Sequence, residues 1–393
     1  MTNDPGEDLN TSNGPGPLGP RFPRHVYVHV PFCARRCSYC DFAIAVRRDV
    51  PVTEFVHAIR SELVARLGTP ASPENIDTLY FGGGTPSHLG ADGVRALLDV
   101  MREFFAWTSD AEVTIEANPD DVSPVATRAW RNAGITRVSL GAQSFDDDVL
   151  RWMHRTHSSD QIDRAVDIIR DTPFESWSFD LIFALPASLD RDWHRDLDLA
   201  LGKLPPHLSL YGLTVEAGTP LGKWSERGEV EAADEQAYEA QFLGAHRAAI
   251  AAGFDHYEVS NFARPGHHAR HNRSYWKGVP YLGVGPSAHG FDGTTRRWNR
   301  AAYAQWLAAV KSGDDPVAGT EPIGAGEESL ETVYLGLRTQ DGLRLDRDDY
   351  PLVEPWIAAE WAILEGDRLR LTPLGWLRLD SLAAALTPVT RSR

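Results

Sequence analysis

Residues 27–42 read YVHVPFCARRCSYCDF, and this stretch decides which fold the rest of the chain is expected to have. An alternating apolar run, typical of a β-strand, leads directly into a polar loop that holds Cys33, Cys37 and Cys40. The chain has three cysteines in all, so the spacing C-x3-C-x2-C is not a framework of paired disulfides. Thiolates spaced this closely favour zinc or an iron–sulfur cluster and indicate a reducing compartment, which predicts the cytoplasm.

The number of protein ligands distinguishes a zinc site from an iron–sulfur cluster. A structural zinc ion needs a fourth ligand, usually from a second Cys or His pair. The sequence has no second CxxC. His29 lies within the predicted strand, where it is expected to point away from the cysteines. A [4Fe-4S] cubane held by three thiolates leaves one iron with an open position. We therefore predict a [4Fe-4S] cluster on the three cysteines, and the alternative is that they are buried in an ordinary core.

Strands and helices alternate from about residue 26 onward. The predicted strands are Val26–Val30, Ile76–Phe81, Glu112–Ala117, Thr136–Leu140, Ser178–Phe183 and Leu208–Leu213. Amphipathic patterns with apolar residues three or four positions apart fill the intervals between them. This alternation predicts an α/β fold of parallel βαβ units, and six units predict a partial (β/α)6 barrel that resembles a TIM barrel.

Four segments are expected along the chain. Residues 1–24 are rich in Gly, Pro, Asn and Asp and are predicted to be a disordered tail, while residues 25–260 form the barrel. Residues 261–324 connect the barrel to a smaller helical, winged-helix-like domain at residues 325–393. In that domain a short strand runs into a helix, with Thr372 as its N-cap and Pro373 as its first residue.

The composition excludes several classes of protein. The formal net charge of -16 over 393 residues argues against non-specific binding to nucleic acid, which needs a basic surface. No apolar stretch is long enough to cross a bilayer, and the first twenty residues have no apolar core that could serve as a signal peptide. We expect neither a nucleic-acid partner nor a transmembrane segment.

Glycine or polar residues lie in or directly after the later part of each predicted strand. Each of them alone is more simply a turn, a cap or a surface charge. In a parallel barrel, however, the loops after the strands line one mouth, so their recurrence at successive strand ends predicts a single pocket. The residues at these ends include Gly83, Gly84, Thr85, Glu116, Gln143, Asp180 and Tyr211.

The cysteine loop after the first strand of an α/β barrel resembles that of the radical S-adenosylmethionine superfamily. The resemblance implies that S-adenosylmethionine occupies the open iron, and that reduction of the cluster can cleave it to a 5′-deoxyadenosyl radical. From about His25 to the C-terminal segment, the chain is similar to the oxygen-independent coproporphyrinogen III oxidase family. That similarity implies that S-adenosylmethionine is bound by Tyr27, Tyr39, Gly83, Gly84, Thr85, Glu116, Gln143, Arg155 and Asp180.

This family contains true oxidases and a branch of heme chaperones, and three features resemble the chaperones. The oxidases carry another Cys two residues after the third ligand, where this chain has Asp41-Phe42. They also have a structured N-terminal extension, whereas the first strand here is expected at about Val26 after a low-complexity segment. Residues 271–276, HNRSYW, match the HNxxYW signature of the chaperone branch, which is associated with heme binding.

The motif offers an imidazole for iron and two aromatic faces for a flat macrocycle. We therefore predict that His271, Tyr275 and Trp276 contact heme, with His267, His268 and His289 as competing axial ligands. The alternative is that the Tyr and Trp pack in the core while the His makes ordinary hydrogen bonds.

Taken with the resemblance, the sequence predicts a heme chaperone that binds a [4Fe-4S] cluster, S-adenosylmethionine and heme. It is expected to pass heme to an acceptor protein, and the resemblance suggests a membrane-bound respiratory protein. The alternative function is an oxygen-independent coproporphyrinogen III oxidase, which decarboxylates propionate side chains by a radical route. A third possibility is a radical methyltransferase or another radical enzyme.

Overall fold

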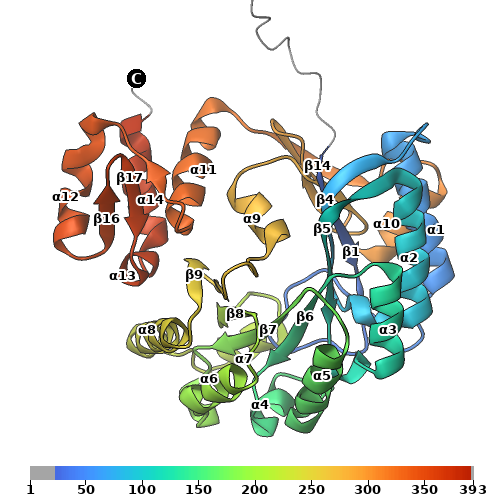
Figure 1. Cartoon of the computed structure of the whole chain (residues 1–393), viewed down its shortest axis with the longest axis horizontal. Helices are drawn as coiled ribbons and strands as arrows, with labels where there is room; N and C mark the ends of the chain where they lie inside the picture. The colour runs from blue at the N-terminus through green and yellow to red at the C-terminus, as the bar shows by residue number, and fades with distance from the viewer. Residues whose placement is uncertain (1–22, 391–393) are drawn as a thin grey trace, which may run out of the picture.

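The computed structural model describes residues 23–390, so the tail predicted for residues 1–24 lies, up to residue 22, outside the described residues. A nine-stranded sheet forms the centre of the molecule (Figure 1). Its middle consists of the six predicted strands, all parallel and paired in chain order. They are β1 (His25–Val30), β4 (Glu74–Gly83), β5 (Phe105–Ala117), β6 (Arg137–Gln143), β7 (Ser176–Phe183) and β8 (His207–Gly212). The predicted partial barrel is confirmed.

Both edges of this sheet are completed by later parts of the chain. At one edge β11 (Leu282–Val284) pairs in parallel with β1, with Leu282 opposite Val26. At the other edge β10 (Asn261–Ala263) and β9 (Asp255–Glu258) continue antiparallel beyond β8. The segment predicted as a connection therefore also supplies strands to the sheet, which extends beyond six strands and stays open.

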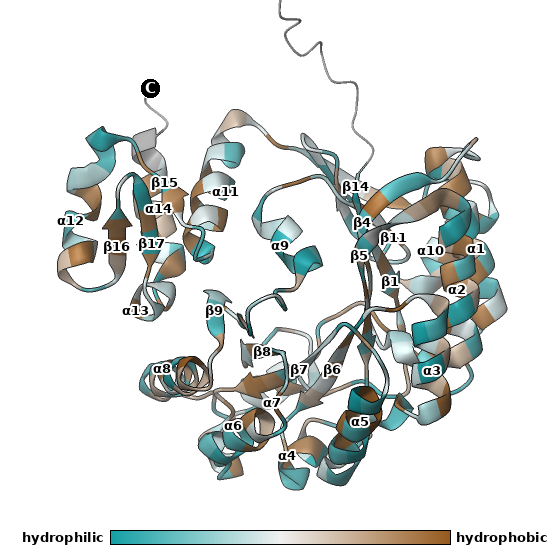
Figure 2. Cartoon of the chain, viewed as in Figure 1, coloured by the Kyte–Doolittle hydropathy of each residue, from teal (hydrophilic) through white to brown (hydrophobic). Residues whose placement is uncertain are grey.

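Helices cover the convex face of the sheet (Figure 1). The longer ones are α1 (Val52–Leu67), α2 (Gly90–Phe104), α3 (Pro124–Ala133), α5 (Ser159–Asp171), α6 (Trp193–Gly202) and α8 (Glu235–Ala251). Helix α3 shows why they begin and end where they do. The Ser123 hydroxyl accepts a hydrogen bond from the Ala126 amide, and Gly134 ends the helix with a φ of 107°. In Figure 2, α5 carries both hydrophilic and hydrophobic residues, as a helix packed on a sheet requires.

The C-terminal unit consists of a small antiparallel sheet and four helices, and this confirms the predicted winged-helix-like domain. Its strands are β15 (Leu343–Arg344), β16 (Ala362–Glu365) and β17 (Arg368–Leu371), and its helices are α11 (Ala325–Arg338), α12 (Tyr350–Ala358), α13 (Pro373–Trp376) and α14 (Leu379–Thr390). As predicted, the Thr372 hydroxyl caps α13 by accepting a hydrogen bond from the Gly375 amide at 3.2 Å. Within residues 23–390, no helix combines the length and apolar character needed to cross a membrane.

Smaller elements surround these two parts. They are β2 (Phe32–Cys33), β3 (Ala45–Val46), β12 (His289–Phe291), β13 (Thr295–Asn299), β14 (Val317–Pro322), α4 (Asp147–Trp152), α7 (Pro220–Glu226), α9 (Arg270–Trp276), α10 (Tyr303–Lys311) and the 3-10 turns Pro86–Leu89, Pro119–Asp121, Ala187–Leu189 and Arg347–Asp349. Helix α9 lies on the concave side of the sheet, between the strands and the C-terminal unit (Figure 1).

One arginine joins the C-terminal unit to this inner helix. Arg338, the last residue of α11, forms a buried ion pair with Glu258 of β9 at 3.0 Å. Its guanidinium also lies over the ring of Trp276, 4.1 Å from the ring centre, which is a cation–π contact. Arg273 of α9 adds an ion pair to Asp341 at 3.1 Å.

Candidate cofactor site

A single pocket of about 420 Å³ lies where the carboxyl ends of the parallel strands meet. All three cysteines line it. So do eight of the nine residues expected to bind S-adenosylmethionine, which are Tyr39, Gly83, Gly84, Thr85, Glu116, Gln143, Arg155 and Asp180. Parallel strands bring these distant residues together because their carboxyl ends share one edge of the sheet.

The cysteine loop is held at this edge by backbone hydrogen bonds. Strand β2 pairs with β3 across the loop, and the Arg47 amide donates to the Cys33 carbonyl at 2.9 Å. The Ser38 amide donates to the Met153 carbonyl at 3.1 Å, which fixes the middle of the loop to the end of α4. The loop is therefore anchored at its base and at its centre.

The surroundings of the sulfur atoms suit an iron–sulfur cluster. The Thr85 hydroxyl donates to Cys33 Sγ and the Arg155 guanidinium donates to Cys37 Sγ, each at 3.4 Å. Such donors stabilise thiolates that bind iron. Within residues 23–390, no three His, Cys, Asp or Glu side chains converge as ligands of one metal ion would. A cubane does not require this, because each thiolate binds a different iron.

The glycine loop after β4 lies against Glu116. One carboxylate oxygen of Glu116 accepts the Gly83 amide at 3.1 Å, and the other accepts the Tyr80 hydroxyl at 2.8 Å. Only glycine fits here: Gly83 has a φ of 108°, and a Cβ on it would lie 2.6 Å from the His29 ring. A Cβ on Gly84 would lie 2.7 Å from the Pro31 backbone. Tyr80 was not among the predicted residues, since a tyrosine within a strand carries no motif.

Two half-buried carboxyl groups face the pocket. Burial raises the pKa of Glu116 to about 7 and the pKa of Asp180 to about 6. The Ser139 hydroxyl donates to both Asp180 oxygens, at 3.1 and 3.0 Å. A cationic ligand would favour the ionised form of both groups, and S-adenosylmethionine carries an ammonium and a sulfonium. The residues present therefore fit both expected cofactors.

We expect Glu116→Gln to stabilise the ligand-free chain at neutral and higher pH. Because the folded pKa of about 7 lies above the ordinary 4.5, the carboxyl group stabilises the fold fully below pH 4.5. That contribution is lost as the pH rises through 7. The two values correspond to at most about 3 kcal/mol, reduced by any water that screens the charge.

Urea unfolding at several pH values between 5 and 8 measures this difference. The wild-type free energy of unfolding should fall more steeply than that of Glu116→Gln. Asp167→Asn, on the exposed side of α5, should follow the wild type. Equal slopes for the wild type and Glu116→Gln would show that ionised Glu116 is not penalised by its surroundings.

Arg155 connects two of the strand ends to the cysteine loop. Its guanidinium donates to the Gly141 carbonyl at 2.9 Å and to the Asn118 side chain at 2.5 Å, besides the contact with Cys37. The ends of β5 and β6 and the cysteine loop therefore share one guanidinium.

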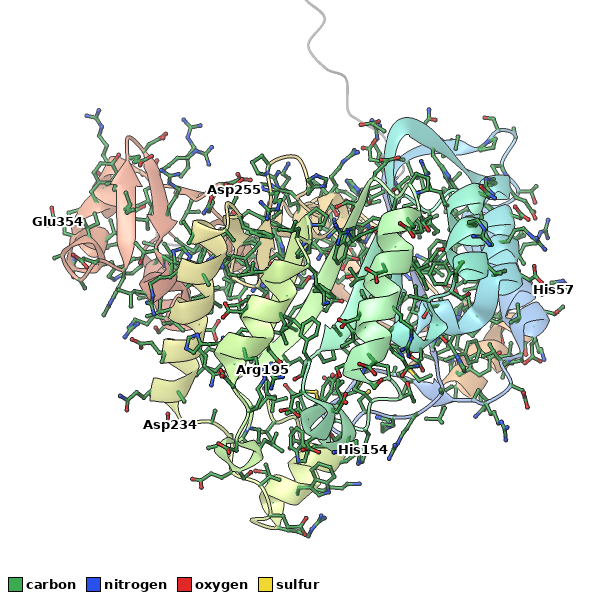
Figure 3. All side chains as sticks on the ribbon, turned by 60° about the horizontal axis from the view of Figure 1, so that its bottom comes forward. His57, His154, Arg195, Asp234, Asp255 and Glu354 are labelled. Atoms are coloured by element: carbon green, nitrogen blue, oxygen red, sulfur yellow. The ribbon has the colours of Figure 1, made fainter. Side chains whose placement is uncertain are left out.

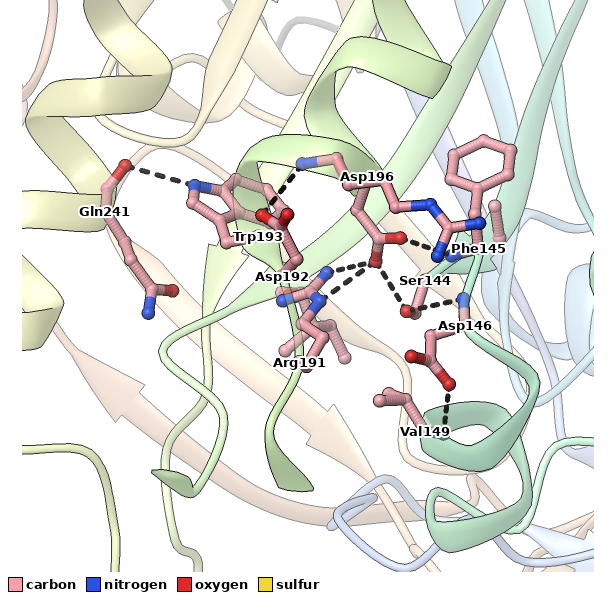
Figure 4. Close-up of polar contacts among 12 residues, drawn as sticks. Ser144, Phe145, Asp146, Val149, Arg191, Asp192, Trp193, Asp196 and Gln241 are labelled. Atoms are coloured by element: carbon pink, nitrogen blue, oxygen red, sulfur yellow. Dashed lines mark hydrogen bonds and ion pairs between the residues drawn. The ribbon is translucent and has the colours of Figure 1, made fainter. Parts of the chain in front are cut away.

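A buried ion pair behind the pocket holds the end of β6. Gln143 has a left-handed φ of 69°, and the next residue, Ser144, donates its hydroxyl to Asp196 at 2.5 Å (Figure 4). Asp196 also accepts the Phe145 amide at 3.1 Å and pairs with Arg191 at 2.6 Å, and both charged side chains are only 3% exposed. The pair thus positions the turn that carries Gln143. Its two residues were not predicted, because they have no part in the motif.

Tyr27 is the one expected S-adenosylmethionine residue that is absent from the pocket lining. Its ring stacks on Tyr80 with centroids 6.1 Å apart, and its hydroxyl lies 3.1 Å from His29 Nδ1. Its ring also lies 6.5 Å from the ring of His271, so Tyr27 is turned toward α9.

The predicted heme motif is packed against the sheet. His271 is 1% exposed, with Nδ1 at 2.7 Å from the Thr78 hydroxyl and Nε2 at 2.8 Å from the Tyr275 hydroxyl. Both ring nitrogens are thus occupied, as in the alternative interpretation of the motif. Trp276 lies under Arg338. In this conformation neither nitrogen of His271 is available to iron.

The three competing histidines make other contacts. His268 stacks on Tyr257 with ring centroids 4.2 Å apart, and His267 Nδ1 lies 3.1 Å from the Ser176 hydroxyl. His289 is exposed and stacks on Trp298 at 6.0 Å. None of the three lines the pocket that holds the cysteines.

Comparisons with known proteins agree with this architecture. Residues 27–200 match the Radical SAM superfamily. The heme chaperone HemW of Mycobacterium tuberculosis strain H37Rv is 39% identical over 93% of this chain and 95% of its own length. The heme chaperone HemW of a Synechocystis strain is 38% identical over 82% of this chain and 79% of its own. The structure of coproporphyrinogen III oxidase (HemN) from Escherichia coli superposes with a TM-score of 0.78 at 21% identity, covering 94% of this chain and 91% of that one. This last likeness shows the fold.

Proposed function

The chain belongs to the HemW family of the radical S-adenosylmethionine superfamily, and on that premise we propose that it is a cytoplasmic heme chaperone. It would bind a [4Fe-4S] cluster, S-adenosylmethionine and heme, and pass the heme to an acceptor protein. A membrane-bound respiratory protein is the acceptor that we propose. The observation that carries the proposal is the pocket in which three cysteines meet the strand-end residues.

We assign protein residues to the cluster and to S-adenosylmethionine. Cys33, Cys37 and Cys40 would hold the cluster, with Thr85 and Arg155 donating hydrogen bonds to two of the sulfur atoms. S-adenosylmethionine would be surrounded by the glycine loop and by the side chains of Tyr39, Gln143, Glu116 and Asp180. Bound together, the cluster and S-adenosylmethionine supply one-electron chemistry, while these side chains bind and orient the ligand.

Contact between heme and His271, Tyr275 and Trp276 would require α9 to move. His271 must first give up its hydrogen bonds to Thr78 and Tyr275. Trp276 must also leave the Arg338 guanidinium. We therefore propose that α9 receives heme only after it has opened, which makes this step slow.

An anaerobic experiment on one reconstituted preparation tests the function. With coproporphyrinogen III, reductant and S-adenosylmethionine, we expect no protoporphyrinogen, because Asp41 and Phe42 stand where the oxidases have a further cysteine. Titration with hemin should give a saturable Soret band at one heme per chain. Formation of protoporphyrinogen would overturn the chaperone proposal in favour of the oxidase.

A further inference from the structure

His154 has a backbone conformation that is uncommon outside glycine. It follows α4 with a left-handed φ of 60°, its amide donates to the Arg151 carbonyl at 3.0 Å, and the Arg155 amide donates to the Leu150 carbonyl at 2.9 Å. This pair of hydrogen bonds is the Schellman motif, whose left-handed position is usually glycine. A residue with a Cβ costs about 1–2 kcal/mol there. Strain of this kind is found most often at functional sites.

The imidazole of His154 lines the mouth of the cofactor pocket, together with Arg35 and Phe42. Figure 3 places it at the lower end of the molecule. The Arg36 backbone lies close to one ring nitrogen. Among residues 23–390 we find no hydrogen-bond partner for its other ring nitrogen. Unlike His271, His154 therefore has one nitrogen free to bind a metal.

One aromatic ring lies against this histidine, and a second lies against the first. The Trp224 ring lies 5.6 Å from the imidazole, edge to face, and Trp152 lies 5.9 Å from Trp224. Both indoles are only partly buried. Phe42, across the pocket mouth, is 56% exposed, which is a large exposed fraction for a phenylalanine. The rim therefore offers partly exposed apolar faces.

An arginine supplies positive charge near this histidine. Arg35 is exposed and lies close enough to His154 to act on its charge. An arginine pairs well with a carboxylate, because its planar donors match the two oxygens. An imidazole, flanking indole rings and an arginine together match a flat apolar macrocycle with a central iron and peripheral propionates.

We propose that heme first docks at a rim site formed by His154 and Arg35, which line the pocket, together with Trp224 beside His154 and Trp152 beside Trp224. The proposal rests on the proposed function and adds a residue set outside the HNxxYW motif. His154 binds the heme iron, the two indoles contact the macrocycle, and Arg35 pairs with a propionate. The tetrapyrrole lies across the mouth of the pocket, because the space within is needed for the cluster and S-adenosylmethionine.

His154→Gly gives a direct test, because glycine removes the imidazole and also relieves the left-handed strain. The variant should unfold at a temperature no lower than the wild type. The readout is hemin binding to the full-length reconstituted chain, followed by the Soret band at equilibrium and by stopped flow. We expect at least a tenfold loss of affinity and loss of the fast phase. Free imidazole should restore the Soret position of an imidazole-bound heme.

Two further variants serve as controls. His57→Ala removes an exposed histidine of α1, on a different part of the molecule (Figure 3), and should leave both phases unchanged. His271→Ala should keep the fast phase and alter the slow one. An unchanged affinity, spectrum and fast phase in His154→Gly would overturn the rim site. Absence of saturable hemin binding in the wild type would instead overturn the proposed function.

Discussion

Cys37→Ser is expected to leave the chain colourless after anaerobic reconstitution, whereas the wild type should turn brown. Removing one of three thiolates leaves two protein ligands, too few to retain a cubane. The substitution also removes the sulfur atom to which the Arg155 guanidinium donates. The charged guanidinium therefore loses its hydrogen-bond acceptor on the cysteine loop. Iron and sulfide content and the visible absorption spectrum measure the loss, which should be complete.

The neighbouring residue supplies a matched control. Ser38 lies in the same loop, and its buried hydroxyl has no hydrogen-bond partner among the described residues. Ser38→Ala should therefore take up iron and sulfide as the wild type does. Full iron and sulfide in Cys37→Ser would contradict the assignment of three ligands. Wild-type protein that holds stoichiometric zinc and refuses iron would exclude the cluster altogether.

Asp196→Ala is expected to lower the free energy of unfolding by roughly 3–5 kcal/mol, because Arg191 would remain buried without its counter-charge. The same change frees the Ser144 hydroxyl and the Phe145 amide, which lie directly after Gln143. We therefore expect weaker binding of S-adenosylmethionine as well. Urea unfolding and calorimetric titration with S-adenosylmethionine measure the two effects.

A double variant separates these effects. Asp196→Leu with Arg191→Met removes both buried charges, so much of the lost stability should return. The hydrogen bond from the Ser144 hydroxyl to Asp196 stays absent in this variant, so binding of S-adenosylmethionine should remain weak. Asp198→Ala, on the exposed side of α6, should change stability by no more than about 0.5 kcal/mol. A double variant that binds S-adenosylmethionine as the wild type does would contradict the positioning role.

The sequence was informative where one rule governs many residues. Parallel topology places the ends of all six strands at one edge, so residues as distant as Gly83 and Asp180 could be assigned to one pocket from their positions in the chain alone. The capping of α13 by Thr372 was likewise predictable, because it depends on residues next to each other in the chain.

Contacts between distant residues without a shared motif were not predictable. Tyr80 meets Glu116, and Arg191 reaches behind the turn at Ser144, only because particular side chains pack in three dimensions. The state of His271 depends on how α9 docks against β4, which places Thr78 beside its ring. A motif defines which residue types are present, but it does not define whether an imidazole nitrogen is free.

Arg338 attaches the C-terminal unit to the inside of the sheet at two points, through its ion pair with Glu258 of β9 and its cation–π contact with Trp276 of α9. If α11 moves away, Trp276 loses its cation–π contact with Arg338. Glu258 then remains buried without a counter-ion. Release of α9 and displacement of α11 are therefore linked in free energy. By reciprocity, a protein that binds the displaced unit promotes the opening of α9 by the same factor by which opening promotes its binding.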